Sequence, residues 1–143
     1  MTSIESNAQF GTFGDWYDAI YSDKEYSRET DFIIDLLEKK NISGKSLLEF
    51  GSGTGRHATE FAKSGYSVHG VEKSERMLAK TVGSSLLSFE QGDITKFRNN
   101  IKYDAVVCLF HVLGYLTTNE NLNAAFQAAN IHLSTGGLFV FDY

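Results

Sequence analysis

Hydrophobic residues in the segment 28–40 recur at the spacing of an α-helix. Phe32, Ile33, Leu36 and Leu37 fall on one face of that helix, with charged side chains opposite them. The pattern predicts an amphipathic helix that ends near Gly44.

From residue 46 onward, short apolar runs alternate with helical patterns. This alternation predicts an α/β fold: a parallel sheet covered by helices on both faces, with ligands bound beyond the carboxyl ends of the strands. Strands are predicted over 46–50, 67–72, 87–92 and 103–110, and a fifth begins with the run LFVF after Gly136 and Gly137. Helices are predicted over 56–63, after the N-cap residue Ser74, and over 119–133.

Length and charge narrow this picture. A chain of 143 residues suits one domain, and its net charge of −5, without clusters of Lys and Arg, argues against a nucleic-acid partner. The N-terminus lacks a signal-peptide pattern, and no apolar run reaches the length of a membrane span. We therefore expect a cytoplasmic protein that binds neither nucleic acid nor membrane.

Cysteine and histidine offer little reactive chemistry. The only cysteine, Cys108, lies in an apolar run and is interpreted as a core residue. The four histidines share no spacing typical of metal ligands, so no metal site is expected.

The run SLLEFGSGTGRH, residues 46–57, places Gly51, Gly53 and Gly55 between the first strand and its helix. Glycines allow positive φ and let a ligand approach the backbone, and the helix N-terminus beyond them attracts negative charge. The spacing G-x-G-x-G departs from the dinucleotide pattern G-x-G-x-x-G, because Arg56 stands where the last glycine would be. By itself, the motif also fits a simple tight turn.

Two acids at later strand ends strengthen the case for a ligand. Glu72 ends the second strand, where a carboxylate can accept hydrogen bonds from both hydroxyls of a ribose. Asp93 follows the third strand, where a carboxylate can accept a hydrogen bond from the amino group of a purine. The alternatives are a solvated glutamate at a strand end and an aspartate that caps a loop or helix.

The segments LLEFGSGTG, VHGVEKSERML, FEQGDI, YDAVVCLFHVLGYL and HLSTGGLFVFDY occur in the order and spacing of class I S-adenosylmethionine-dependent methyltransferases, which the chain resembles over nearly its whole length. The segment FGDWYDAIYSDKEY is similar to the N-terminal part of the branch that methylates amino groups of nucleotide-linked sugars. The resemblance implies a Rossmann-like sheet. It divides the chain into an N-terminal helical or lid segment, 1–45, and a cofactor-binding domain, 46–143. Because the sequence ends at FVFDY, two further strands of that fold are expected to be missing, as in a C-terminally truncated chain.

The resemblance also implies which residues bind S-adenosylmethionine. Glu49 and the glycines match the loop that lies along the methionine part, Glu72 matches the ribose ligand, and Asp93 with Ile94 matches the adenine pair. An acid such as Glu49 suits an ammonium better than a phosphate, which separates this loop from that of an NAD enzyme. The full set of expected cofactor-binding residues is Tyr21, Glu49, Gly51, Ser52, Gly53, Gly55, Glu72, Lys73, Asp93, Ile94 and Phe110.

Methyl transfer from a sulfonium is a direct displacement, so the protein must align the reactants and accept a proton from a protonated amine. The candidates are Tyr17, His111 and Tyr115. Tyr17 lies four residues before Tyr21, and His111 four before Tyr115, so each pair would share a face if helical. The alternatives are packing for the tyrosines and a loop hydrogen bond for His111.

These inferences predict an S-adenosylmethionine-dependent methyltransferase that acts on a small-molecule acceptor, with an amine of a nucleotide-linked sugar as the leading candidate. The alternatives are a cofactor-binding module without catalysis and, less favoured, an NAD-type oxidoreductase. An apolar fifth strand at the sheet edge also predicts a homodimer.

Overall fold

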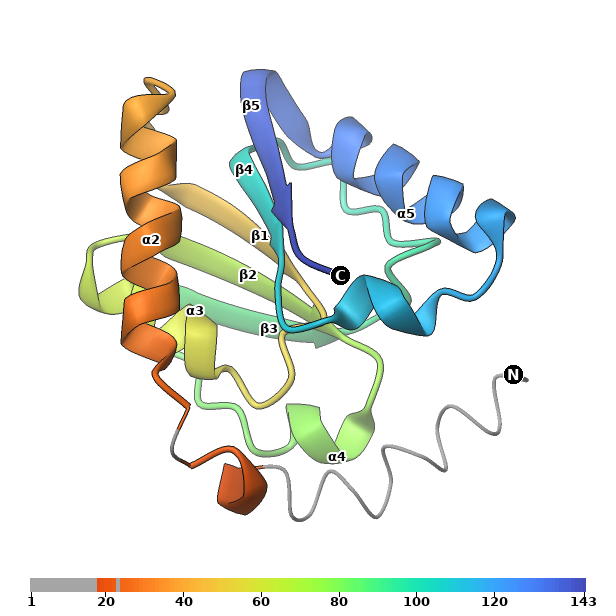
Figure 1. The fold of residues 1–143 in the computed structure, drawn as a ribbon, viewed down its shortest axis with the longest axis horizontal. Helices are drawn as coiled ribbons and strands as arrows, with labels where there is room; N and C mark the ends of the chain where they lie inside the picture. Colours follow the sequence, from red (N-terminus) through yellow and green to blue (C-terminus); the bar gives the residue numbers. More distant parts are fainter. Residues whose placement is uncertain (1–17, 23) are drawn as a thin grey trace.

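The computed structural model describes residues 18–22 and 24–143, and its elements alternate as the sequence pattern predicts (Figure 1). The helices are α2 (Tyr26–Lys39), α3 (Arg56–Lys63), α4 (Glu75–Leu78), the 3₁₀ helix η1 (Val112–Tyr115) and α5 (Asn119–Ile131). The strands are β1 (Ser46–Phe50), β2 (Ser67–Glu72), β3 (Leu87–Gln91), β4 (Tyr103–Cys108) and β5 (Leu133–Phe141).

The five strands form one parallel sheet in the order β3-β2-β1-β4-β5. The chain builds outward from β1 through β2 to β3, then crosses back to β4 on the other side of β1. Ligand sites of open α/β sheets form at such a reversal, at the carboxyl ends of the strands. The topology therefore directs attention to the loops that follow β1 and β4.

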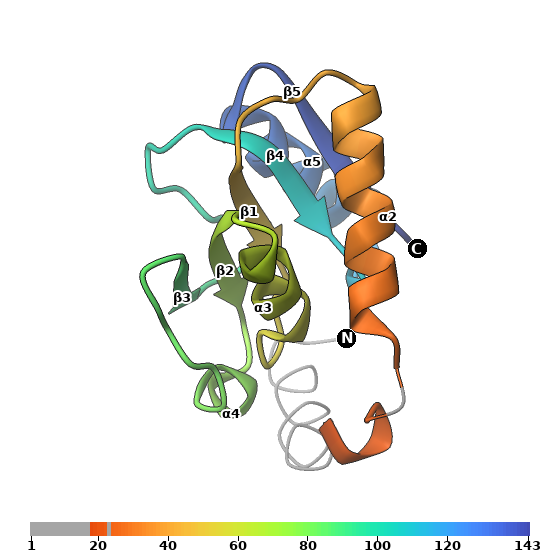
Figure 2. The same ribbon diagram turned by 90° about the vertical axis from the view of Figure 1, so that its left-hand side faces the viewer.

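Helices cover both faces of the sheet, which confirms the predicted architecture. On one face lie α2 and α3 (Figure 2), whose Leu37 and Phe61 share a buried cluster with Leu47 of β1. On the other face, α5 packs through Ala125 and Ala129 against a second cluster of buried side chains. Because β1 contributes to both clusters and is nearly inaccessible to solvent, the loop that follows it starts from a rigid base.

The buried face of α2 differs from the predicted one. Phe32 is 68% exposed, whereas Ile33 and Leu37 are almost fully buried. The stripe that contacts the core runs through Tyr26, Thr30, Ile33 and Leu37, at steps of four, three and four residues. Thr30 can join this stripe because its buried hydroxyl donates a hydrogen bond to the carbonyl of Ser27.

Some element ends also differ from the prediction. β4 ends at Cys108, two residues early, because Phe110 and His111 adopt positive φ and cannot continue a strand. α5 ends at Ile131, and β5 begins at Leu133 with a shift in its pairing to β4 before the predicted LFVF run. Within the described sheet, β5 is an edge strand; the homodimer remains a prediction.

Leu37→Ala should lower the free energy of unfolding by about 2–5 kcal/mol, because it opens a cavity beneath α2. The matched control is Phe32→Ala on the same helix, which should cost less than about 0.5 kcal/mol because the ring is solvent-exposed. Urea denaturation measures both values. Equal losses would show that α2 presents a different face to the sheet.

Candidate active site

The glycine loop after β1 is anchored by its own backbone. The N–H groups of Gly51 and Ser52 both donate to the carbonyl of Val71, at 2.8 and 3.2 Å. The three loop glycines all have positive φ, at 69° for Gly51, 58° for Gly53 and 86° for Gly55. A Cβ at residue 51 would also come within 2.6 Å of Val112. Both the positive φ and this close contact therefore require glycine here.

Two buried polar groups at the end of β1 and in this loop have no hydrogen-bond partner in the described structure: Oε2 of Glu49 and Oγ of Ser52. Burial, with a smaller contribution from the charge of Glu72, raises the pKa of Glu49 to about 8. Gly70 makes room for this arrangement, since a Cβ there would lie 2.7 Å from Ser52. An unsatisfied acid and hydroxyl at the end of a central strand are costly, and a cationic or hydrogen-bonding ligand would compensate for that cost.

Glu72 holds the loop in place from the end of β2. Its Oε1 accepts from the N–H of Gly53 and its Oε2 from the N–H of Ser74, both at 2.8 Å. Burial raises the pKa of Glu72, although these backbone hydrogen bonds oppose the change. A carboxylate has about four lone-pair directions, so both oxygens keep acceptor capacity for a ligand. The alternative of a solvated strand-end glutamate does not hold.

The predicted adenine pair lies just after β3. Oδ1 of Asp93 accepts from the N–H and the hydroxyl of Thr95, at 2.9 and 2.7 Å. Burial alone would raise the pKa of Asp93, but these hydrogen bonds lower it overall. Asp93 thus caps its turn, as the alternative proposed, while the Ile94 side chain is buried in the core and Lys73 is exposed.

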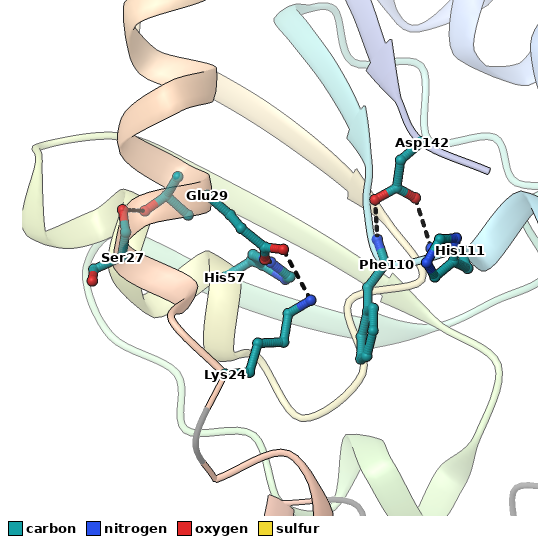
Figure 3. A network of polar contacts seen from close by, with 8 residues as sticks. Lys24, Ser27, Glu29, His57, Phe110, His111 and Asp142 are labelled. Carbon is teal, nitrogen blue, oxygen red and sulfur yellow. Dashed lines mark hydrogen bonds and ion pairs between the residues drawn. The ribbon is translucent and has the colours of Figure 1, made fainter.

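At the end of β4, Phe110 and His111 both occupy the left-handed region, with φ of 67° and 60°. Their N–H groups donate to the two carboxylate oxygens of Asp142, at 2.8 and 2.6 Å (Figure 3). Asp142 follows the end of β5, and the sequence argument missed it. The sequence did contain a signal for it: like Glu72 and Asp93, Asp142 is an acidic residue at the carboxyl end of a strand.

The segment before α2 lies against Phe110. The ring of Tyr21 meets it edge-on, with centroids 4.8 Å apart, and the Lys24 ammonium lies 3.4 Å from the Phe110 centroid. Lys24 also pairs with Glu29 at 3.0 Å, and Glu29 contacts Nε2 of His57 at 2.6 Å (Figure 3). The N-terminal segment is therefore tied to α2, α3 and the β4 loop together.

Sequence reasoning did not single out Lys24, Glu29 or His57 as partners. Burial lowers the pKa of His57, against the opposing influence of Glu29. Burial alone would raise the pKa of Glu29, but hydrogen bonds from His57 and Lys24 lower it overall. Their pairing depends on how α2 crosses α3, which the spacing of residues along the chain does not reveal.

The three predicted catalytic residues have different outcomes. Tyr17 lies outside the described residues. His111 is exposed and precedes η1 as its left-handed N-cap, so it does not share a helical face with Tyr115 as the i, i+4 spacing suggested. Tyr115 is largely exposed at the end of η1, where partial burial and the charge of Tyr21 both raise its pKa.

Within residues 18–22 and 24–143, no group of three or more His, Cys, Asp or Glu side chains is placed to hold a metal ion. None of the helices in this part of the chain combines the length and apolar character needed to cross a bilayer.

Comparison with known proteins places the chain among methyl-transferring enzymes. The sequence profile of a family described as a methyltransferase domain matches residues 47–137. A curated relative from Streptomyces venezuelae, dTDP-3-amino-3,4,6-trideoxy-alpha-D-glucopyranose N,N-dimethyltransferase, is 38% identical over 133 residues, which cover 90% of this chain and 55% of the relative. The chain spans about half the length of the curated relatives it matches.

Solved structures agree in fold. The crystal structure of Streptomyces venezuelae DesVI is 36% identical with a TM-score of 0.77, over 88% of this chain and 55% of that one. SAM-bound CalS10, an amino pentose methyltransferase from Micromonospora echinaspora, is 30% identical with a TM-score of 0.75, over 82% of this chain and 51% of that one.

Glu49 should make folding stability depend on pH. In the unfolded chain its carboxyl ionises near pH 4.5, whereas in the folded protein it keeps its proton up to about pH 8. Its contribution is therefore fully present below pH 4.5 and is lost as pH rises toward 8. Glu49→Gln, which resembles the protonated acid, should abolish this part of the decline.

The measurement is the free energy of unfolding of the ligand-free protein and of Glu49→Gln at pH 5 and pH 8. The difference between the two proteins isolates Glu49 from other titrating groups such as His57 and Glu72. Identical pH slopes would mean that Glu49 is ionised in the fold.

Proposed function

We propose that this chain, which belongs to the methyltransferase domain family, binds S-adenosylmethionine at the carboxyl ends of β1, β2, β3 and β4 and transfers its methyl group to an amine of a small molecule. The observation that carries the proposal is two buried, unsatisfied polar atoms, Oε2 of Glu49 near the end of β1 and Oγ of Ser52 in the following loop, whose glycines have positive φ. Such a cradle offers an acid and a hydroxyl to an amino-acid ligand.

The same loop is poorly suited to a pyrophosphate. The N–H groups of Gly51 and Ser52 donate to Val71, that of Gly53 to Glu72, and that of Gly55 to Ser52. An anion over the loop would find these donors engaged and two buried acids, Glu49 and Glu72, nearby. This disfavours the NAD-type oxidoreductase and favours a ligand with a positively charged end.

We assign the remaining contacts by position. Glu49 and Ser52 would hold the amino-acid end, Glu72 the ribose, and Asp93 with Ile94 the adenine. The Lys24 ammonium lies against the face of Phe110, which supports a role for this ring in contacting a cation such as a sulfonium. Cation–π attraction contributes about 0.5–2 kcal/mol at such sites.

When bound, S-adenosylmethionine supplies a methyl group already activated by a positively charged sulfur. The protein's tasks are then to align the acceptor, to exclude water and to remove a proton from its ammonium. His111 is the proposed proton acceptor, since it is exposed at this edge next to Phe110. Tyr17 and Tyr115 are proposed to position the acceptor.

We also propose that the N-terminal segment, within residues 1–45, closes over the bound ligand as a lid. Asp18 accepts a hydrogen bond from the hydroxyl of Thr54 in the glycine loop, at 2.7 Å, and Tyr21 packs on Phe110. Both contacts connect this segment to the loops that would surround the reacting groups.

The relatives suggest the chemical class of the acceptor. Several carry names of N,N-dimethyltransferases that act on dTDP-linked amino sugars. We propose an amine on a nucleotide-linked sugar for this protein as well.

Calorimetric titration tests the cofactor. S-adenosylmethionine and its demethylated product should bind, and NAD⁺ should not. Glu72→Ala should weaken binding by about tenfold or more, because it removes a ribose acceptor and two charge-assisted hydrogen bonds that order the loop. Glu90→Ala, on the neighbouring strand and exposed, is the matched control and should leave the affinity unchanged. An unaltered affinity in Glu72→Ala would remove this residue from the site.

Mass spectrometry of reaction mixtures tests the acceptor. The dTDP-linked 3-amino sugar named for the Streptomyces venezuelae relative should gain one or two methyl groups. The same sugar with a hydroxyl in place of the amine should gain none, because it lacks the nucleophilic nitrogen. Cofactor binding without methylation of any amine would instead indicate a binding module without catalysis.

A further inference from the structure

We propose that Asp142 is a positioning residue for methyl transfer, a role that rests on the proposed function. Asp142 fixes the backbone of Phe110 and His111 from the far end of β5. It would act through these two residues, without contacting the cofactor or the acceptor.

The geometry carries this inference. Each carboxylate oxygen of Asp142 accepts one backbone N–H, Oδ2 from Phe110 at 2.8 Å and Oδ1 from His111 at 2.6 Å. Two consecutive residues with a Cβ in the left-handed region are unusual and strained, and such strain persists only where surrounding contacts enforce it. The carboxylate supplies that enforcement, since charge-assisted hydrogen bonds are stronger than neutral ones.

Phe110 and His111, held by Asp142, orient the Phe110 ring and the helix η1 that follows them. Phe110 turns its ring toward Tyr21 and Lys24. His111 starts η1, whose first residue, Val112, packs closely against Gly51 of the glycine loop. Asp142 thereby connects β5 to the aromatic ring and to the proposed proton acceptor (Figure 3), and through Val112 to the glycine loop.

The chemistry requires a carboxylate at residue 142. An amide has only one acceptor oxygen, so asparagine would turn its own NH₂ group toward one of the two backbone N–H groups. Asp142→Asn therefore removes one hydrogen bond with almost no change in volume, and it should leave the Glu49–Ser52 cradle intact.

The experiment compares Asp142→Asn with Asp104→Asn. Asp104 is a matched control because its Oδ2 accepts from the N–H and hydroxyl of Ser46, at 2.9 and 2.8 Å, at the opposite end of the sheet. Asp142→Asn should lower kcat for the dTDP-linked 3-amino sugar by about tenfold or more, because small misplacements of reacting groups are costly. Its Kd for S-adenosylmethionine should change by less than about threefold, because the lost hydrogen bond is not a ligand contact.

A second readout does not depend on catalysis. Hydrogen exchange followed by NMR should show the N–H groups of Phe110 and His111 exchanging about tenfold faster or more in Asp142→Asn, and at the wild-type rate in Asp104→Asn. Wild-type exchange at both N–H groups in Asp142→Asn would overturn the clamp. Normal kcat with faster exchange would overturn the positioning role. A wild type that binds no S-adenosylmethionine would refute the proposed function, while the exchange data would still test the clamp.

If Asp142→Asn is too unstable for kinetic measurements, thermal unfolding of a double-mutant cycle replaces the kinetics. Glycine adopts positive φ without support, so in a His111→Gly background Asp142→Asn should lower Tm less than it does in the wild type. The same loss of Tm in both backgrounds would mean that Asp142 does not enforce the left-handed turn.

Discussion

The buried carboxylate of Glu72 joins the turns that follow the neighbouring strands β1 and β2 at the carboxyl edge of the sheet. One oxygen holds Gly53 of the glycine loop and the other holds Ser74, where the chain enters α4. Without this acceptor, two backbone N–H groups in a largely buried region would lose their partner, and the loop would lose its fixed distance from β2. The glycine loop next to Glu49 keeps its position because Glu72 binds the N–H of Gly53.

The buried acids have an energetic cost that a folded scaffold must offset. Glu49 and Glu72 are both almost fully buried, and burial raises the pKa of each. The apolar clusters on the two faces of the sheet supply the compensating stability, since β1 is packed on both sides directly before the loop. The unsatisfied polar atoms of Glu49 and Ser52 lie at the carboxyl end of this well-packed strand.

The sequence predicted the parallel α/β sheet, the glycine loop and the Ser74 cap, because these depend on local periodicity and on side chains close in sequence. It predicted the family for the same reason, since the motifs follow one another in a fixed order. It placed Phe32 in the core wrongly, because a helix with apolar residues at several angles does not reveal which stripe meets the sheet. The Asp142 contacts were beyond reach, since the bonded groups are separated by 31 and 32 residues and meet only when β5 pairs with β4.

The separation of these residues in sequence also means that they are synthesised at different times. A ribosome makes a chain from its N-terminal toward its C-terminal side, and domains begin to organise as they emerge. Phe110 and His111 are synthesised long before their acceptor, so the nascent chain can form β1 to β3 and the glycine loop while the turn after β4 still lacks its anchor. The turn after β4 gains its anchor only once β5 has been made and pairs with β4.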